Sequence, residues 1–294
     1  MTTLPTGTTL PTGLHGAHVR SALEDRLGPP TLRTAVGEGA LVRYGRRVLV
    51  VRERALDFRT RCAAALLAAG PHAVLARETA LSLHGCTAAG VGTLHVRVPY
   101  WAGTGRHAGV RVHHGRVGAV REVDGLRCQP VAEALGDVLC RGDRYVALAC
   151  ADEALHDLPA AGRADLKAAV REEIVNRPDP RGTRRAATLL DLATGKSPCR
   201  SRLLLTLVDA GLPVPEQHYA APDGRTFDYA WPTAALALDY APTAEPGDGR
   251  EPTGWTLLHA GPADLRNPTA LISRLTRELH ARLLPGRPGR RSPH

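Results

Sequence analysis

The chain has 294 residues, a formal net charge of +9 at pH 7, and 43% hydrophobic but only 4% aromatic residues. This length allows two or three domains of about 100–200 residues each. No segment reaches the roughly 18 apolar residues of a membrane span, and no secretory signal is recognisable at the start. We therefore expect a soluble, cytoplasmic protein without a membrane partner, and the basic charge favours a polyanionic partner such as DNA.

The cysteines and lysines of the chain restrict its chemistry further. The six cysteines are scattered, with no CxxC pair and no spacing to histidine that would suit zinc, so we expect reduced, buried thiols. Lys167 and Lys196 are the only lysines, so arginine carries nearly all the positive charge. A GC-rich genome also favours arginine codons, which by itself accounts for the choice of arginine over lysine.

The first residues repeat one hexapeptide, Thr-Thr-Leu-Pro-Thr-Gly, over 2–7 and 8–13. Two copies cannot form a solenoid, so residues 1–13 are predicted to be a disordered tail. A first helix is predicted over 19–27, ended by Gly28-Pro29-Pro30. A short second helix is predicted from Thr31, which can cap it, to about Val36.

A basic hairpin follows the two helices. Apolar runs over 40–44 and 48–51 flank Gly45-Arg46-Arg47, and residues 14–61 hold ten arginines against five acids. We predict a winged helix-turn-helix over 14–52, with DNA contacts from Arg33 on the second helix and from Arg43, Arg46 and Arg47 on the wing. In order and pattern this segment resembles the N-terminal domain of AbiEi-type antitoxins, and the resemblance implies a DNA-binding regulator.

Residues 53–125 are predicted to form an α+β segment. It holds an apolar helix from Ala63 to Gly70, a short helix over 79–85, and strands over 94–99 and 110–114. A comparable passage follows the winged helix in the same antitoxin family. His84, His113 and His114 lack a partner base or metal spacing, so we assign them structural or solvent-exposed roles.

Residues 126–195 are predicted to form a helical linker block. Apolar residues recur at three- and four-residue steps in four stretches: 131–140, 145–158, 165–175 and 184–192. The acids of this block are interpreted as solvated helix faces; they include Asp137, Asp152, Glu153, Glu172 and Glu173.

A second hairpin is predicted near the C-terminus, with strands over 225–230 and 235–240 around the turn residues Trp231-Pro-Thr-Ala234. Centring the turn on Pro232-Thr233 pairs Asp228 with Ala237. Phe227, Tyr229, Leu236 and Leu238 then share one face, and Asp228, Ala235, Ala237 and Asp239 share the other. Asp228 and Asp239 become diagonal neighbours with Cα atoms roughly 7–8 Å apart.

Residues 196–284 resemble the endonuclease-like domain of a bacterial family akin to very-short-patch-repair endonucleases. The resemblance rests on Ser-Pro-Cys-Arg-Ser-Arg-Leu-Leu-Leu from Ser197, the hairpin, Gly254-Trp255, and Asp264-Leu-Arg-Asn-Pro before a closing helix. It implies a PD-(D/E)XK fold with a Mg²⁺-binding set of acids. Asp228 and Asp239 match two of these positions, whereas Arg200 stands where the helix glutamate is expected and Ala241-Pro242 replaces an Asp-Gly.

We therefore predict a multi-domain α/β protein that binds DNA and carries a degenerate, inactive endonuclease-like domain without a cofactor. Residues 285–294 are predicted to be a basic disordered tail. One alternative is a working endodeoxyribonuclease in which Asp228 and Asp239 hold Mg²⁺. Another is an antitoxin-like regulator whose C-terminal half binds a toxin or another protein. The sequence leaves the DNA site and the oligomeric state open.

Overall fold

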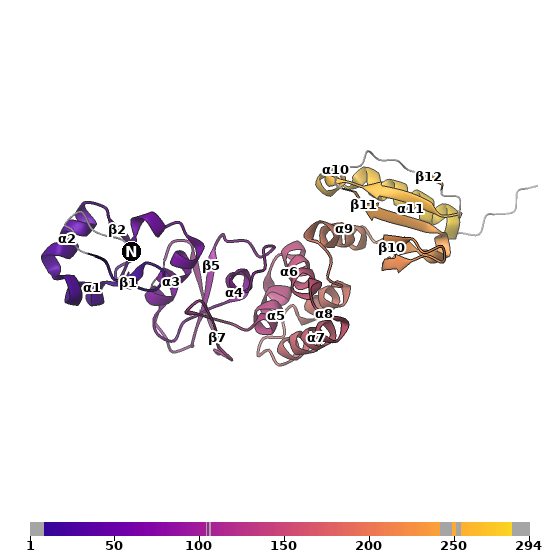
Figure 1. Cartoon of the computed structure of the whole chain (residues 1–294). Coiled ribbons are helices and arrows are strands. Elements are labelled where there is room, and N and C mark those ends of the chain that lie inside the picture. Colours follow the sequence, from indigo (N-terminus) through magenta and orange to yellow (C-terminus); the bar gives the residue numbers. More distant parts are fainter. Residues whose placement is uncertain (1–8, 104, 106, 242–248, 251–253, 284–294) are drawn as a thin grey trace, which may run out of the picture. The chain divides into compact units, whose positions relative to one another are not determined.

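The computed structural model describes residues 9–103, 105, 107–241, 249–250 and 254–283 (Figure 1). The chain divides into two compact units, Met1–Leu192 and Ala193–His294. Both units combine helices with sheets that contain parallel and antiparallel pairs, so the chain is a mixed α/β, multi-domain protein, as predicted. The predicted tail over 285–294 lies outside the described residues. The finer divisions predicted within the first unit stay predictions.

The N-terminal sheet is built around strand β3 (Val48–Val51). This strand lies between β1 (Ala17–Val19) and β2 (Leu41–Tyr44) and is antiparallel to both. Helices α1 (Arg20–Leu27) and α2 (Pro29–Gly37) connect β1 to β2. The two predicted helices and the hairpin are thereby confirmed, although α2 begins at Pro29 and not after Thr31. Strand β1 was not predicted.

The turn between α1 and α2 follows from two residue types. Gly28 ends α1 with a φ of 76°, a conformation that glycine adopts without a steric cost. Pro29 begins α2 at a position where the backbone N–H has no acceptor within the helix, so the missing donor costs nothing. The two helices therefore follow one another with a single residue between them.

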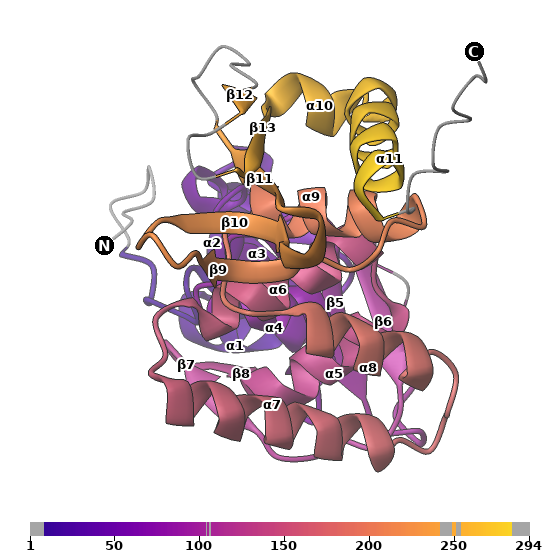
Figure 2. The same ribbon diagram turned by 90° about the vertical axis from the view of Figure 1, so that its right-hand side faces the viewer.

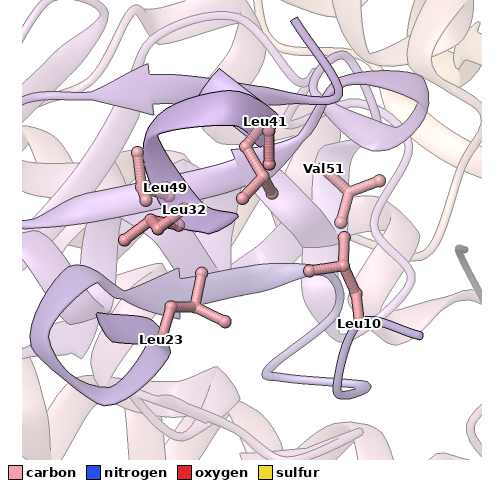
Figure 3. Packing of buried hydrophobic residues seen from close by; sticks show 7 residues of the cluster. Leu10, Leu23, Leu32, Leu41, Leu49 and Val51 are labelled. Carbon is pink, nitrogen blue, oxygen red and sulfur yellow. The ribbon is translucent and has the colours of Figure 1, made fainter. Parts of the chain in front are cut away.

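Seven buried apolar side chains join these helices to the sheet (Figure 3). They are Leu10, Leu23, Leu32, Ala35, Leu41, Leu49 and Val51. The predicted disordered tail is therefore wrong from Leu10 onward, because Leu10 is only 3% exposed. Burying a leucine side chain stabilises the fold by about 1.5–3 kcal/mol, which holds this part of the chain in place. Residues 1–8 lie outside the described residues.

Helix α3 (Phe58–Ala69) contacts both sheets of the first unit. It packs against β1 and β3, and also against β5 (Leu94–Val98) and β8 (Leu126–Cys128) of the second sheet. Most of its buried residues are alanines, which allow the backbone of the helix to approach its neighbours closely.

The second sheet has the strand order β6-β5-β4-β8-β7. Strand β5 pairs parallel with β6, and the strands predicted over 94–99 and 110–114 are thus confirmed. The remaining elements of this part are the 3-10 helix η1 (Arg52–Arg54), β4 (Val74–Leu75), α4 (Arg77–Leu83), β6 (Val110–His114) and β7 (Arg121–Val123).

The helical block is organised by α5 (Val131–Arg141), which packs against α4 and the three helices that follow. These helices, all predicted, are α6 (Arg144–His156), α7 (Ala160–Val175) and α8 (Thr183–Leu192). Helix α6 begins after Asp143, whose carboxylate accepts hydrogen bonds from the backbone N–H groups of Tyr145 and Val146.

Two acids of this block contradict the predicted solvated faces. Asp137 and Asp152 are 3% and 1% exposed, respectively. Glu153 is half-buried, and its carboxylate accepts hydrogen bonds from the backbone N–H groups of Thr87 and Ala88. These carboxylates lie on helix sides that pack against other elements and are therefore shielded from water. Of the five acids named for this block, Glu172 and Glu173 are exposed as predicted.

The second unit contains one sheet with the strand order β12-β13-β11-β10-β9, in which β11 and β13 are parallel (Figure 2). Strand β13 directly follows Gly254-Trp255, and the predicted closing helix is confirmed as α11. The elements are α9 (Pro198–Asp209), β9 (Glu216–Ala220), β10 (Thr226–Trp231), the 3-10 helix η2 (Pro232–Ala234), β11 (Leu236–Tyr240), β12 (Gly249–Arg250), β13 (Thr256–Ala260), α10 (Pro262–Arg266) and α11 (Thr269–Leu283).

The described residues contain neither a helix suited to a membrane nor a cluster of side chains suited to a metal ion. None of their helices is long and apolar enough to cross a bilayer. In the same part of the chain, no three or more His, Cys, Asp or Glu residues are grouped so that they could hold a metal ion.

Leu10→Ala should reduce the stability of the N-terminal elements by about 2–5 kcal/mol, as expected when a buried leucine is truncated and leaves a cavity. Hydrogen exchange in the full chain measures this loss as faster exchange of the amides of α1 and α2. Thr12→Ala is the matched control, because Thr12 is exposed and its substitution should stay within about 0.5 kcal/mol of the parent. Unchanged exchange in Leu10→Ala would contradict the role of Leu10 in this core.

Candidate functional site

The hairpin β10–β11 places Asp228 and Asp239 side by side. Its register pairs Tyr229 with Leu238 and Ala230 with Ala237, so Asp228 falls opposite Asp239. The predicted pairing of Asp228 with Ala237, and the diagonal placement that followed from it, are therefore wrong. The reason lies in the turn, where η2 and Ala235 form a four-residue connection and not the two-residue turn assumed.

Ala235 completes this connection with a left-handed backbone, at a φ of 45°. Its N–H donates to the carbonyl of Pro232 at 3.0 Å, which closes the turn. An alanine in this conformation carries a steric cost that glycine would avoid.

Strand β10 is irregular at Asp228. The pairs on either side of this residue are regular, but the Asp228 N–H donates to Oδ1 of Asp239 at 2.7 Å, and its carbonyl accepts from Nζ of Lys196 at 2.5 Å. Side-chain alternation consequently breaks, and Phe227 packs with Ala230 and Ala237. The prediction that placed Phe227 and Ala237 on opposite faces is thus wrong. Irregular strand positions are common beside functional sites.

An arginine holds the carboxylate of Asp228. Oδ2 of Asp228 lies 2.7 Å from Nε of Arg200 on α9, and it also accepts the backbone N–H of Tyr240 at 3.0 Å. The hydroxyl of Tyr229 donates to the carbonyl of Arg200 at 2.6 Å, which fixes α9 against β10. The hydrogen bond to Asp228 raises the pKa of Arg200, so this guanidinium stays charged. Arg200, which stands where the helix glutamate is expected, therefore forms an ion pair with one of the two acids.

Lys196 was not recognised from the sequence as part of this cluster. It is 3% exposed, and its ammonium lies 3.9 Å from the centre of the Tyr229 ring. A lone lysine just before a helix carries no pattern that would have identified it. Its position could have been inferred only from the folded hairpin.

These residues do not fit a Mg²⁺ site. Mg²⁺ requires oxygen ligands and local negative charge, but Oδ2 of Asp228 is bound to Arg200 and the ammonium of Lys196 adds a second positive charge nearby. The Ala241 side chain offers no ligand atom; its backbone N–H donates to the carbonyl of Ala260, as part of the sheet. Pro242 lies outside the described residues. Asp228 and Asp239 therefore form, with Arg200 and Lys196, a cluster held by protein cations.

Asp239 is the acid of this cluster whose charged form is destabilised. Burial raises its pKa, and the nearby charge of Asp228 adds to the rise, while the hydrogen bond from the Asp228 N–H and the charges of His259 and Arg200 oppose it. His259 lies beside Asp239 in the parallel register of β11 and β13. The ionised form of Asp239 is thus less stable in the folded chain than in water.

The predicted DNA-contacting arginines lie on one part of the first unit. Arg33 on α2 is exposed, and it lines a hollow of about 200 Å³ together with Arg43 of β2. Arg46 and Arg47 are exposed at the turn between β2 and β3. The carbonyl of Arg47 accepts the N–H of Arg20 at 2.8 Å, which ties this turn to the start of α1. The structure therefore brings Arg33 and Arg43 to the same hollow and leaves all four side chains accessible.

The three histidines assigned structural or solvent-exposed roles, His84, His113 and His114, have different surroundings. A ring nitrogen of His84 lies 2.9 Å from the carbonyl oxygen of Gln129, and His113 stacks on His95. His114 is exposed. His113 also lines a charged cavity with Arg97 of β5, which the sequence did not reveal.

Comparisons with known proteins give relatives from one organism. No family model matches the sequence. The uncharacterized protein Rv2248 of Mycobacterium tuberculosis strain H37Rv is 32% identical over 248 residues, which cover 80% of this chain and 81% of the relative. The uncharacterized protein MT2308 of strain CDC 1551 matches with the same figures. The crystal structure of the RV2827C protein of M. tuberculosis is similar with a TM-score of 0.42 and 14% identity, over 86% of this chain and 89% of that one.

Millimolar Mg²⁺ should leave the melting temperature of the parent unchanged, because a ligand that does not bind the native state cannot shift unfolding. Arg200→Glu places a carboxylate next to Asp228 and should introduce a Mg²⁺-dependent rise in melting temperature. Thermal melts with Mg²⁺ and with a chelator measure both effects.

The control for this test is Arg202→Glu, which makes the same charge change at an exposed position of the same helix. It should gain no response to Mg²⁺. Stabilisation of the parent by Mg²⁺, abolished by Asp228→Asn, would show instead that a metal site is present.

Asp239→Asn should raise the melting temperature at neutral pH, because the amide oxygen still accepts the Asp228 N–H and the disfavoured charge is removed. The pKa of Asp239 is raised in the folded chain, so the gain should be largest above that pKa and disappear as the pH falls below about 3.9, the value for free aspartate. Thermal melts of the parent and of Asp239→Asn from neutral pH to below about pH 3.9 measure this pH-dependent gain in melting temperature. Asp223→Asn should show the opposite sign at neutral pH, because a hydrogen bond from Arg225 lowers the pKa of Asp223. A loss of stability in Asp239→Asn at neutral pH would contradict the interpretation.

Proposed function

The chain belongs to the family of the Mycobacterium tuberculosis protein Rv2248, and we propose that it is a DNA-binding regulator. The observation that carries this proposal is the grouping of exposed arginines on α2 and on the turn of the following hairpin. The second unit, in this proposal, keeps the framework of an endonuclease-like domain and does not cleave DNA.

The arrangement of α1 and α2 suits a helix-turn-helix. In such motifs the second helix enters the major groove, and the first helix crosses the backbone. The outward face of α2 is formed by residues at three- and four-residue steps, Pro30, Arg33, Thr34 and Gly37, all of which are exposed. Leu32 and Ala35 point to the core on the other side. Arg33 is thus the long basic side chain that α2 offers to a groove.

The hairpin adds phosphate contacts beside this helix. Arg43 lines the same hollow as Arg33, and Arg46 and Arg47 extend the positive charge along the turn. Arginine contacts to phosphate are independent of sequence and position a protein on the duplex. The excess of ten arginines over five acids within residues 14–61 concentrates about half of the net charge of +9 in this segment. The resemblance to AbiEi-type antitoxins supports the same assignment.

The cluster around Asp228 supports the absence of cleavage. Metal-assisted cleavage of a phosphodiester needs a divalent ion that is held by acids and that activates or positions water. Here Arg200 binds the carboxylate that would hold the ion, and Lys196 lies next to it. The ion pair preserves the packing of α9 on the hairpin in place of a metal.

Replacing Arg33, Arg46 and Arg47 together with alanine should weaken DNA binding and flatten its salt dependence. Each phosphate contact contributes a slope of about −0.9 to the log–log plot of affinity against salt for duplex DNA. Fluorescence anisotropy with a labelled duplex, over roughly 50–300 mM salt, measures both the affinity and the slope.

The matched control replaces Arg121, Arg266 and Arg277, three exposed arginines on other elements, and makes the same change in net charge. It should keep the parental slope. Equal binding by the first triple variant and the parent would contradict the proposed surface. Cleavage of the duplex with Mg²⁺ or Mn²⁺, lost in Asp228→Asn, would contradict the inactive second unit.

A further inference from the structure

A cavity of about 780 Å³ lies in the first unit, between the second sheet and the helical block. Its volume is within the range of about 300–1,000 Å³ that is common for small-molecule sites. Its walls differ from those of most such sites, because they carry six arginines and four acidic residues. The formal excess of two positive charges favours an anionic ligand.

Two acids of the cavity, Asp137 and Asp179, are already engaged by arginines. Asp137 contacts Arg97 and Arg177, and Asp179 contacts Arg141 and Arg181. Burial lowers the pKa of His113 to about 4, with a further contribution from Arg77, so its ring is neutral at physiological pH. The surplus charge therefore belongs to arginine side chains, which bind phosphate well because their planar guanidinium groups offer paired donors.

Arg77 is held in an unusual position at this cavity. Its backbone is left-handed, with a φ of 54°, and its N–H donates to Oε1 of Gln129 at 2.8 Å. Such strained positions in non-glycine residues are often found at ligand sites. The contacts of its guanidinium with Glu78 are long, at 3.4 and 3.5 Å. Arg77 therefore lines the cavity with a guanidinium that its contacts with Glu78 only partly engage.

Arg177 lines the same cavity, and one of its terminal nitrogens binds Asp137. Its Nε has no hydrogen-bond partner among the described residues. Arg77 and Arg177 thus present two half-buried cations to the same space, where low solvent exposure strengthens their attraction for an anion.

The rim of the cavity carries an aromatic ring. Tyr100, two residues after the end of β5, is 72% exposed and lines the cavity, as do Arg116 and Glu173. An exposed ring can stack on a nucleobase, and a carboxylate such as that of Glu173 can accept hydrogen bonds from sugar hydroxyls or base amino groups. A simple phosphate ion would use neither of these groups.

We propose that this cavity binds a nucleotide, with its phosphates on Arg77 and Arg177 and its base against Tyr100. The site is separate from the arginines of α2 and of the β2–β3 turn. Nucleotide binding at the cavity can therefore be tested independently of DNA binding by those residues.

Isothermal titration calorimetry with the full chain tests the proposal. The probes are ATP, GTP, CTP and UTP, with pyrophosphate and adenosine for comparison. At least one nucleotide should bind with 1:1 stoichiometry, and more tightly than either pyrophosphate or adenosine.

Two variants separate the phosphate and base contacts. Arg77→Asn keeps a residue that tolerates the left-handed backbone and should weaken nucleotide and pyrophosphate binding about tenfold or more, as expected for the loss of charged hydrogen bonds. Tyr100→Ala changes an exposed side chain and should weaken nucleotide binding about fivefold or more, as for lost stacking, while pyrophosphate binding stays unchanged. If Arg77→Asn does not fold, the same binding measurements are made with Arg116→Ala, which changes an exposed arginine of the cavity wall.

The Arg33, Arg46 and Arg47 triple variant is the control and should bind the nucleotide as the parent does. Absence of binding by all four nucleotides, or binding that neither variant weakens, would overturn the proposal. Pyrophosphate binding as tight as nucleotide binding would reduce the cavity to a phosphate site. Displacement of the nucleotide by a single-stranded oligonucleotide, with an equal loss of DNA affinity in Arg77→Asn, would assign the cavity to DNA.

Discussion

The carboxylate of Asp137 connects three parts of the first unit that are far apart in the sequence. It accepts hydrogen bonds from Arg97 on β5, from Arg177 after α7 and from Gln129 before α5. Burial alone would raise its pKa, but the charges of Arg97 and Arg177 and the hydrogen bonds from Arg177 and Gln129 outweigh this and lower it. An ionised acid at this depth is tolerated only with such partners, and removal of one partner from a buried pair costs about 3–5 kcal/mol. The position of the helical block relative to the second sheet, and the walls of the charged cavity, depend on this interaction.

The second unit uses the same pairing at a less buried place. Arg200 neutralises Asp228, and Asp228 in turn orders Tyr240 and Asp239 through backbone hydrogen bonds. A guanidinium is part of the chain and is present in every folded molecule, whereas a divalent ion must be bound from solution. A sheet position that favours two neighbouring acids can therefore remain stable once a helix residue supplies the positive charge. This explains how the hairpin accommodates two neighbouring acids without a bound metal ion.

Much of the fold follows from local patterns. The hairpin around Gly45-Arg46-Arg47, the four helices after Pro130 and the pair of strands around Pro232 are all set by periodicity and turn residues. Two features could not be predicted from the sequence: the register of one hairpin and the burial of one leucine. The register of β10 and β11 depends on the left-handed Ala235, for which alanine gives no signal. Leu10 looked like part of a polar repeat, because its burial depends on Leu49 and Val51, about 40 residues later. Asp137 did carry a usable signal, since it lies three residues after Ala134 on the apolar side of its helix, and a charged residue within the valine-rich strand at Arg97 was its natural partner.

Helix α3 has a consequence for how the first unit unfolds. Alternation along β3 turns Leu49 and Val51 toward α1 and α2, so Val48 and Val50, which are equally buried, face the side covered by α3. The same helix covers β5 and β8 of the neighbouring sheet. Neither sheet can therefore lose α3 without exposing valines, and the N-terminal segment is not an autonomous module despite its self-contained sequence pattern. We therefore expect the two sheets to unfold in one cooperative transition, and a peptide cut after residue 52 to leave one face of its central strand open to self-association.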